Sequence, residues 1–331
     1  MTVAEPRFWM NGKSASTLID LSDDPRSLDD GGFWAVSVSY EGAWHCAKFA
    51  DIYDEPFSTL DSWPETTNEW STSHSQGEYM EYVDAIRQAI AAGDVYQANA
   101  CRIYSRKNEH DLEALFAKLL VENPAPYAHY LKIPGLEIAS ASPELFLEIN
   151  QHKGFREMRS SPIKGTSKDR FFAEKDQAEN IMIVDLVRND MSEVCDIGSV
   201  QVPRLLGIEE HPGLFHLVSD VVGRLRSGVS WSDIGKALLP AGSISGAPKS
   251  TAVKIIEAHE GTRGPYCGVS GWVHGAEARL AVGIRTFWQR NGQLLFGTGA
   301  GITWGSDPLE EWNETVLKAS RLLAIAGGGF S

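Results

Sequence analysis

The chain has few cysteines and no metal-binding cysteine motif. Its 331 residues include only Cys46, Cys101, Cys195 and Cys267, which lie far apart and form no Cys-x-x-Cys pair. This spacing argues against a zinc site and against a disulfide framework. Free, buried thiols in a reducing compartment are the simpler expectation.

Signals for membranes and secretion are also lacking. No apolar stretch reaches the roughly 18 residues that a membrane-spanning helix needs. The first residues, MTVAEPRFWMNGKS, contain no basic segment followed by an apolar one, so they do not resemble a signal peptide. We therefore expect a cytoplasmic protein that does not bind membranes.

Basic residues are outnumbered by acidic ones, 30 to 44, which gives a formal net charge of -14. Because no basic run stands out, nucleic acid and anionic membrane surfaces are poor partner candidates. A small anionic ligand stays compatible with this balance if its pocket is locally positive. The hydrophobic content of 43% is typical of a soluble globular protein with a large core.

The first third of the chain predicts few regular elements. Residues 32–50 alternate and are rich in aromatics, which predicts two strands joined by a turn at Glu41-Gly42. We expect the rest of residues 1–70 to be irregular and 51–76 to be a polar linker. Ser75 and Glu78 form a capping box that starts a helix, and Gly93 is suited to end it.

Beyond Gly93, strands and helices mix without a regular βαβ order. We expect strands near 94–104, 127–133, 136–150, 198–203, 216–225, 267–274, 279–289 and 293–302, and helices near 111–121, 171–187, 231–239, 248–259 and 308–326. Neighbouring strand pairs favour large, mostly antiparallel sheets that form a layered sandwich with helices outside, an α+β fold. We expect a short strand-rich extension, residues 1–70, to form one structural unit with a larger domain, residues 71–326.

Lys164 lies between a proline and a Gly-Thr step, in Ser161-Pro162-Ile163-Lys164-Gly165-Thr166. Such a lysine is held on a short, stiff piece of backbone. In a dry pocket its amine would lose hydration, favour the neutral form and become a nucleophile. Taken alone, the motif is far more typical of a solvated lysine in a surface turn, so its context has to decide.

Two acidic pairs lie on predicted helices: Asp176 with Glu179, and Glu311 with Glu314. A spacing of three residues places each pair on one helical face. Carboxylates that converge repel one another unless a hard cation such as Mg²⁺ lies between them. Two solvated acidic faces are the alternative. Glu179 precedes an apolar run and Glu314 lies one step from Leu317, so both are expected near a buried boundary.

Other residues suggest acid chemistry and anion binding. Glu144 precedes apolar strand residues, and a carboxyl held against such a surface has a raised pKa and can act as a general acid. The alternative is a strand-edge glutamate in water. His216 has apolar neighbours, as core histidines usually do. Arg285 could grip a carboxylate with two hydrogen bonds.

The glycine-rich segment 297–301 follows a predicted strand. Its spacing differs from the dinucleotide-binding fingerprint, and no helix follows directly. Consecutive glycines can turn backbone amides toward a carboxylate, although a plain β-turn is the alternative.

The ordered set of these segments resembles the chorismate-utilising enzymes, which include anthranilate synthase component I, aminodeoxychorismate synthase component I, and the isochorismate and salicylate synthases. The matching segments are SPELF (142–146), PIKGT (162–166), AENIMIVDLVRND (178–190), HLVS (216–219), GSISGAPK (242–249), IRT (284–286), GTGAGI (297–302) and DPLEEWNETVLKA (307–319). They span about residues 140–320, and weaker similarity reaches back to residues 93–97.

Within this family, anthranilate synthases usually carry alanine at the position of Lys164, whereas lysine is typical of aminodeoxychorismate synthase component I. The resemblance therefore implies an enzyme that converts chorismate and ammonia to 4-amino-4-deoxychorismate, in p-aminobenzoate and folate synthesis. It also implies that residues 71–326 form the chorismate-binding catalytic domain.

The resemblance assigns roles to individual residues. It implies Lys164 as a covalent nucleophile and Glu144 as the general acid, and it adds His216 to the catalytic candidates. The implied Mg²⁺ ligands are Glu179 and Glu314, with Asp176 and Glu311 behind them. The implied substrate-binding residues are Arg285, Thr286, Gly299, Ala300, Gly301, Lys318, Ser245 and Gly246.

The source of ammonia has to lie outside these segments, because no cysteine has the context of a glutaminase nucleophile. A separate glutamine amidotransferase subunit is implied, and so is a separate aminodeoxychorismate lyase. Three alternatives stay open: anthranilate synthase component I, an isochorismate-type synthase that uses water, and a non-catalytic subunit that only docks an amidotransferase. Lys164 argues against the first, and the full set of site residues argues against the last.

Overall fold

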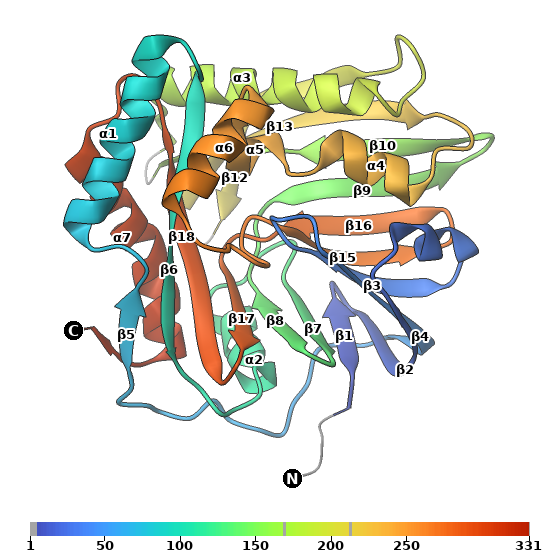
Figure 1. The fold of residues 1–331 in the computed structure, drawn as a ribbon. Coiled ribbons are helices and arrows are strands. Elements are labelled where there is room, and N and C mark those ends of the chain that lie inside the picture. The colour runs from blue at the N-terminus through green and yellow to red at the C-terminus, as the bar shows by residue number, and fades with distance from the viewer. Residues whose placement is uncertain (1–4, 168–169, 212–213, 331) are drawn as a thin grey trace.

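The computed structural model describes residues 5–167, 170–211 and 214–330, and its strands form one connected series that is antiparallel except at β19 (Figure 1). In order of pairing, the series runs through β5 (Glu69–Thr72), β6 (Gln97–Lys107), β18 (Gln293–Ile302), β17 (Thr286–Arg290), β8 (Leu136–Ser140), β7 (His129–Ile133), β1 (Arg7–Met10), β2 (Lys13–Ser22), β4 (Trp44–Asp54), β3 (Phe33–Val38), β15 (Val269–His274), β16 (Glu277–Val282), β9 (Leu145–His152), β10 (Phe155–Ser161) and β13 (Leu214–Leu225). β13 then pairs with both β11 (Ile163–Ser167) and β12 (Gln201–His211).

Two short strands complete the pairing. β14 (Gly246–Ala247) joins β6 in antiparallel orientation, and β19 (Gly329–Phe330) runs parallel to β5. Antiparallel sheets with helices outside are the α+β architecture that the sequence predicts, and this prediction is confirmed.

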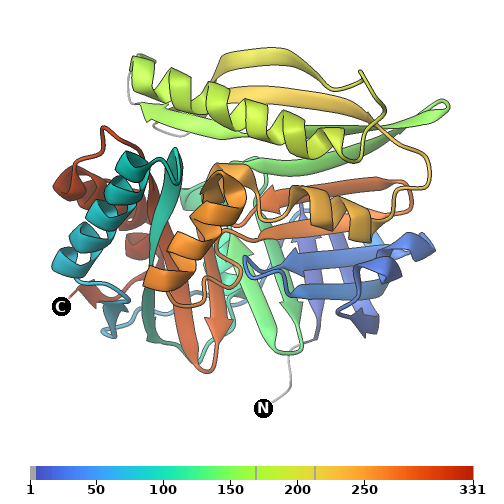
Figure 2. The ribbon, with the colours of Figure 1, turned by 45° about the horizontal axis from the view of Figure 1, so that its top comes forward.

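Most helices pack near the two ends of the strand series. The helices are η1 (Pro25–Asp30), α1 (Gln76–Ala92), α2 (Glu113–Glu122), α3 (Glu174–Ser192), α4 (Trp231–Leu238), α5 (Gly242–Ser245), α6 (Lys249–His259) and α7 (Pro308–Ala326). Away from those ends, α2 packs on β7 and β8, and η1 on β4. α3 lies across β12 and β13 (Figure 2), whereas α1, α6 and α7 pack on β6 and β18. No helix in the described part of the chain is long and apolar enough to cross a membrane.

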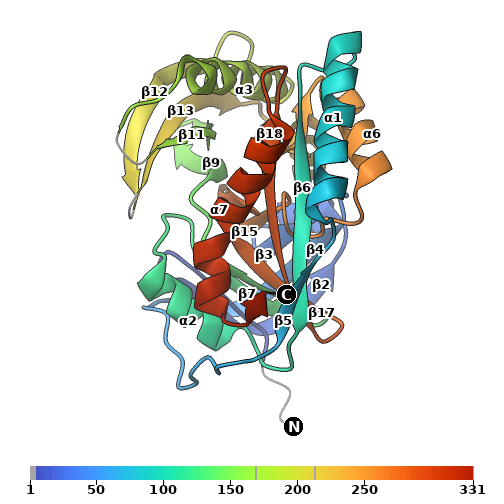
Figure 3. The ribbon, with the colours of Figure 1, turned by 90° about the vertical axis from the view of Figure 1, so that its left-hand side faces the viewer.

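The strand series bends so that its ends face each other. α3, β11 and β13 lie opposite α7 and β18 (Figure 3). Side chains join the two ends directly, because Gln97 on β6 donates to Glu179 on α3 at 2.6 Å. This closure brings segments that are far apart in the sequence to one place.

Local signals explain α1 well. The Ser75 side chain accepts from the amide of Glu78, the Glu78 carboxylate accepts from the amide of Ser75, and Gly93 ends the helix with a φ of 83°. Tyr79 and Val83 then pack into a cluster against β6 and β18. The predicted turn in residues 32–50 is also present, with Gly42 at a φ of 85° between β3 and β4.

Several strands depart from the sequence-based expectation. The prediction that residues 1–31 are irregular is wrong, because β1 and β2 lie there, and the predicted linker contains β5. β10 and β11 were not expected, and β12 is longer than expected. β2 is half exposed and polar, so it alternates weakly, and its pairing with β1 and β4 supplies the order that its own sequence does not. β1 pairs with β7, so the extension belongs to the same strand series.

Candidate active site

Lys164 projects from β11 and forms an ion pair with Glu179 of α3. The Lys164 Nζ to Glu179 Oε1 distance is 2.9 Å, and each side chain is only 13% exposed. Burial raises the pKa of Glu179, but the Lys164 ammonium and the Gln97 amide lower it more. The pKa of Glu179 is therefore lowered overall. The structure therefore places Lys164 in a largely buried ion pair rather than in a solvated turn.

Glu144 lies just before β9 and is 4% exposed. Its carboxyl accepts hydrogen bonds from the Ser243 hydroxyl and the Ile163 amide. Burial raises the pKa of Glu144 to about 7, although Ser243 and the nearby charge of Lys164 oppose that rise. A carboxyl with this pKa can hold a proton near neutral pH and release it in a reaction, as a general acid does.

The four acidic candidates have different surroundings. Glu314 is about half exposed and lies 2.5 Å from Lys318. Burial raises the pKa of Glu314, but the Lys318 ammonium lowers it more, so the pKa is lowered overall. The negative charge of Glu179 opposes this change by raising the pKa of Glu314. Glu179 and Glu314 are therefore close enough for their charges to influence each other.

The other two carboxylates have structural partners. Asp176 accepts from the Ala173 amide at 3.1 Å and so caps α3. Glu311 is buried, lies 3.6 Å from Lys175 and accepts a hydrogen bond from Ser306. Burial is the main reason that the pKa of Glu311 is raised.

These surroundings test the fit of a magnesium ion. Across residues 5–167, 170–211 and 214–330, no three His, Cys, Asp or Glu side chains converge as a complete metal cage. Mg²⁺ in enzymes is often held by only one or two protein carboxylates, with substrate oxygens and waters completing the shell. Glu179 and Glu314 are hard oxygen donors on facing helices and fit that pattern, whereas Asp176 is used as a helix cap.

Arg285 and His216 form a second polar group. Arg285 has a φ of 52°, a left-handed conformation that costs energy for a residue other than glycine. Its Nη2 lies 3.4 Å from His216 Nε2. Because a guanidinium can only donate, this contact requires His216 Nε2 to be unprotonated. Burial lowers the pKa of Arg285. Thr286 is buried, with its hydroxyl 2.8 Å from that of Ser140.

The glycine segment 297–301 lies within β18 and is not a turn. β17 pairs with β18 only as far as Phe296, and no pairing beyond Phe296 is seen on that edge within the described residues. Among the described residues, the backbone groups on that edge beyond Phe296 therefore take no part in strand pairing. A Cβ on Gly301 would lie 2.4 Å from Gln97 Nε2 and 2.7 Å from Glu179 Oε1, so a larger residue would displace the ends of these two side chains. Lys318 donates to the Gly299 carbonyl at 3.1 Å.

Ala300, between these glycines, is buried beneath α1 and α6. Ser245 and Gly246 form the junction of α5 and β14. The Ser245 hydroxyl donates to the Ala241 carbonyl at 2.9 Å. Gly246 has a φ of 139°, and a Cβ there would lie 2.2 Å from the Gln97 carbonyl. Gly246 thereby lets β14 approach β6 closely.

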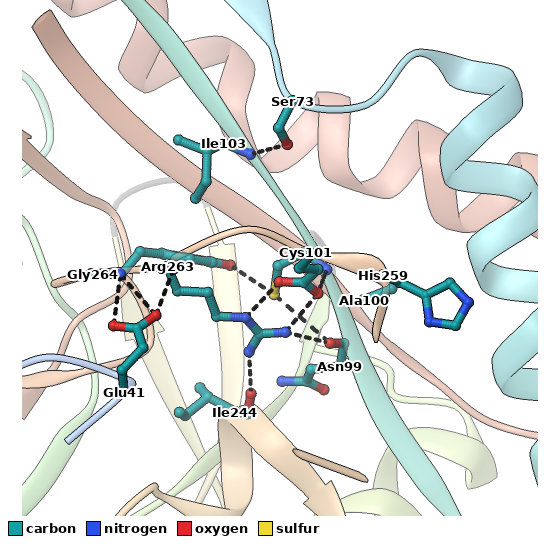
Figure 4. Close-up of polar contacts among 12 residues, drawn as sticks. Glu41, Ser73, Asn99, Ala100, Cys101, Ile103, Ile244, His259, Arg263 and Gly264 are labelled. Atoms are coloured by element: carbon teal, nitrogen blue, oxygen red, sulfur yellow. Dashed lines mark hydrogen bonds and ion pairs between the residues drawn. The ribbon is translucent and has the colours of Figure 1, made fainter. Parts of the chain in front are cut away.

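Sequence reasoning missed a buried network beside the site (Figure 4). Arg263 is 1% exposed. It donates to the Asn99 carbonyl at 2.8 Å, to the Ile244 carbonyl at 3.1 Å and to Glu260 at 2.7 Å. It thereby ties β6 to α5. Its sequence context, Gly261-Thr262-Arg263-Gly264, resembles a surface turn and gave no signal of burial.

The comparisons identify the family. Residues 38–324 match the sequence model of the chorismate binding enzyme family. The chain belongs to this family. The resemblance seen in the ordered motifs is thereby confirmed.

Family relatives carry two activity names. The chain is 40% identical over 267 residues to "Aminodeoxychorismate synthase" of Streptomyces pristinaespiralis, covering 76% of this chain and 37% of that protein. It is 35% identical over 269 residues to "Anthranilate synthase component 1" of Aquifex aeolicus, covering 77% of this chain and 54% of that protein. The chain thus spans about half or less of these relatives' length.

A solved structure supports the fold. Anthranilate synthase component I from Streptococcus pneumoniae aligns with a TM-score of 0.80 at 22% identity, covering 98% of this chain and 93% of that one. The shared fold and the family assignment leave the choice of reaction to the chemistry of the site.

Proposed function

We propose that the chain converts chorismate and ammonia to 4-amino-4-deoxychorismate through a covalent adduct on Lys164. The observation that carries the proposal is the placement of the Lys164 amine in a buried ion pair, within the electrostatic influence of a protonatable Glu144. A nucleophile and a general acid in one pocket are what an addition with loss of a hydroxyl group requires.

The first step would form the adduct. Lys164 reacts as a neutral amine, having released its proton to solvent, and its nitrogen bonds to ring C2 of chorismate. Both ring double bonds shift, the C4–oxygen bond breaks, and Glu144 protonates the departing hydroxyl, which leaves as water.

The second step would use ammonia. Its nitrogen bonds to C4, both ring double bonds shift back, and the bond between C2 and Lys164 breaks. The new C4 ammonium then returns a proton to Glu144. The balance is chorismate plus ammonia to 4-amino-4-deoxychorismate plus water, with the enolpyruvyl group retained.

Positive groups would bind the dianionic substrate in this acidic protein. Arg285 offers a guanidinium for one carboxylate, and the open edge of β18 offers backbone amides near Lys318 for the other. Mg²⁺, held by Glu179 and Glu314, would add positive charge for the ring carboxylate. His216, which contacts Arg285, would orient the guanidinium.

The partners follow from the same chemistry. We propose a cytoplasmic p-aminobenzoate and folate pathway enzyme that receives ammonia from a glutamine amidotransferase subunit and passes its product to a separate lyase. Several relatives share the name aminodeoxychorismate synthase, which supports this choice.

The test is direct product identification. The purified chain is incubated with chorismate, ammonium chloride and Mg²⁺, and products are separated by liquid chromatography with mass detection. We expect 4-amino-4-deoxychorismate and no pyruvate. Fluorescent anthranilate with stoichiometric pyruvate would support the second candidate, anthranilate synthase, which the Aquifex relative favours. No turnover with ammonia would support a docking subunit.

A further inference from the structure

Two buried amide side chains at the site have carbonyl oxygens that accept no hydrogen bond from any described residue. Gln97 is 1% exposed and Asn99 is 9% exposed, and both lie on β6. Within the part of the chain that the structure describes, nothing donates to Gln97 Oε1 or to Asn99 Oδ1. A buried acceptor left unpaired costs about 1–3 kcal/mol, so its retention calls for an explanation.

The orientation of both amides is determined by their nitrogen ends. Gln97 Nε2 donates to Glu179 Oε1 at 2.6 Å, and Asn99 Nδ2 donates to the Ser243 carbonyl at 3.2 Å. Both partners are acceptors, so turning either amide over would place oxygen against oxygen. The unpaired atoms are therefore carbonyl oxygens, and a ligand that pairs with them has to bring N–H or O–H donors.

The two oxygens lie between the groups that the proposed reaction uses. Gln97 shares Glu179 Oε1 with Lys164. Asn99 shares Ser243 with Glu144, because the Ser243 hydroxyl donates to the Glu144 carboxyl. The position where a Gly301 Cβ would be lies 3.2 Å from Asn99 Oδ1, so both amides face the glycine strip of β18.

The backbone beneath Asn99 is held rigidly. Arg263 donates both to the Asn99 carbonyl and to the Ile244 carbonyl, so β6 and the helix that carries Ser243 are fixed relative to each other (Figure 4). A binding site for a small ligand needs this rigidity, because a molecule with few atoms binds only where its hydrogen-bonding partners are already in place.

We propose that Gln97 Oε1 and Asn99 Oδ1 bind and orient the ammonia nucleophile. Ammonia has three N–H donors and one lone pair. Two accepted N–H bonds leave the lone pair directed away from β6, toward a substrate bound between Lys164 and Glu144. The inference rests on the proposed function, since it names the groups that bind its second substrate.

The experiment measures steady-state kinetics with ammonium chloride and chorismate varied separately, in Asn99→Leu and Gln97→Met. Each substitution removes one unpaired oxygen with little change in volume, and it also removes the bond from the amide nitrogen to the Ser243 carbonyl or to Glu179. We expect KM for ammonia to rise about tenfold in each variant, as for the loss of one hydrogen bond, with KM for chorismate unchanged in Asn99→Leu. In Asn99→Leu, adduct formation with chorismate alone, followed by intact-protein mass, should also be unchanged because it precedes ammonia.

A matched control separates this effect from general damage. Asn108 follows the other end of β6, is 4% exposed and bonds to Gln289 and the His110 carbonyl. Asn108→Leu should lower stability as much as Asn99→Leu does while leaving KM for ammonia unchanged.

The outcomes are distinct. An unchanged KM for ammonia in both variants overturns the inference, and so does a rise in KM for chorismate alone, which would assign the oxygens to a substrate hydroxyl. Neither result touches the proposed function, which fails instead if the wild-type chain forms no 4-amino-4-deoxychorismate. If the wild type formed anthranilate, the ratio of KM for ammonia between variant and wild type would still test whether Gln97 and Asn99 bind ammonia.

Discussion

Two ion pairs contact β6 at positions two residues apart, and their surroundings differ. The Lys164–Glu179 pair contacts Gln97, and the Arg263–Glu260 pair contacts Asn99. Arg263 and Glu260 are 1% and 5% exposed, and the Arg263 nitrogens also reach two backbone carbonyls. Lys164 and Glu179 are each 13% exposed, and the Glu179 oxygen that binds Lys164 is shared with Gln97. The first pair is almost completely buried, whereas the second is partly exposed to solvent.

The chemistry of the two bases matches this difference. A guanidinium stays protonated and its planar fork suits fixed, multiple hydrogen bonds. An amine can lose its proton and attack carbon. We infer that the Arg263–Glu260 pair holds the fold, and that the Lys164–Glu179 pair keeps a reactive lysine in position until substrate arrives.

The largest expected effect is on activity, in Lys164→Ala. Removing the nucleophile should lower aminodeoxychorismate formation by roughly 10³-fold or more. Lys164→Arg keeps the charge but cannot supply a neutral amine, so it should be nearly inactive as well. The measurement is product formation together with peptide mapping after reaction with a chorismate analogue fluorinated at C2. Near-normal turnover by Lys164→Ala, with no labelled peptide, would refute the assignment.

The next effect concerns stability and tests the Arg263–Glu260 pair. Arg263→Met leaves Glu260 buried without its partner, and breaking such a pair costs about 3–5 kcal/mol. Lys164→Met should cost less than half of that, because Glu179 keeps Gln97 and is reached by water. Urea denaturation of both variants gives the comparison. Equal losses would show that the two pairs have the same structural role.

Glu144→Gln should slow the reaction about 10²–10⁴-fold by removing the general acid. Wild-type activity should also fall as pH rises above about 7, the value to which burial raises the pKa of Glu144. Because the folded-state pKa lies above the ordinary 4.5, Glu144 stabilises the fold below about pH 4.5 and this contribution is lost as pH rises to about 7.

The matching stability test compares wild type with Glu144→Gln. Between about pH 4.5 and pH 7, the wild type should lose at most about 3 kcal/mol of folding stability through Glu144. This loss should be missing in Glu144→Gln. Denaturation midpoints at pH 5 and pH 8 measure it. A wild-type chain whose stability relative to Glu144→Gln does not change with pH would contradict the raised pKa.

The smallest expected effect is in Glu314→Gln. The loss of one carboxylate should raise the Mg²⁺ concentration needed for half-maximal activity about tenfold or more. Stability should change by less than about 1 kcal/mol, because the pair with Lys318 is half exposed. Titration of activity with Mg²⁺ is the measurement, and full activity of the wild type in excess EDTA would exclude the metal.

Some features of this protein follow from sequence alone. The Ser75–Glu78 box and Gly93 delimit α1, and Asp307 with Pro308 starts α7, because caps act within one helical turn. The ordered motifs around Lys164 and Glu144 were also sufficient to predict the family. In each case the information lies in residues that are neighbours along the chain.

Other features were decided only by the tertiary structure. A carboxylate such as Asp176 can cap a helix or bind a metal, and its sequence context is the same in both cases. Gln97 meets Glu179 across 82 residues, and Arg263 meets Asn99 across 164. These contacts exist because the strand series closes on itself, and short-range propensity carries no information about which distant side chains such a closure brings together.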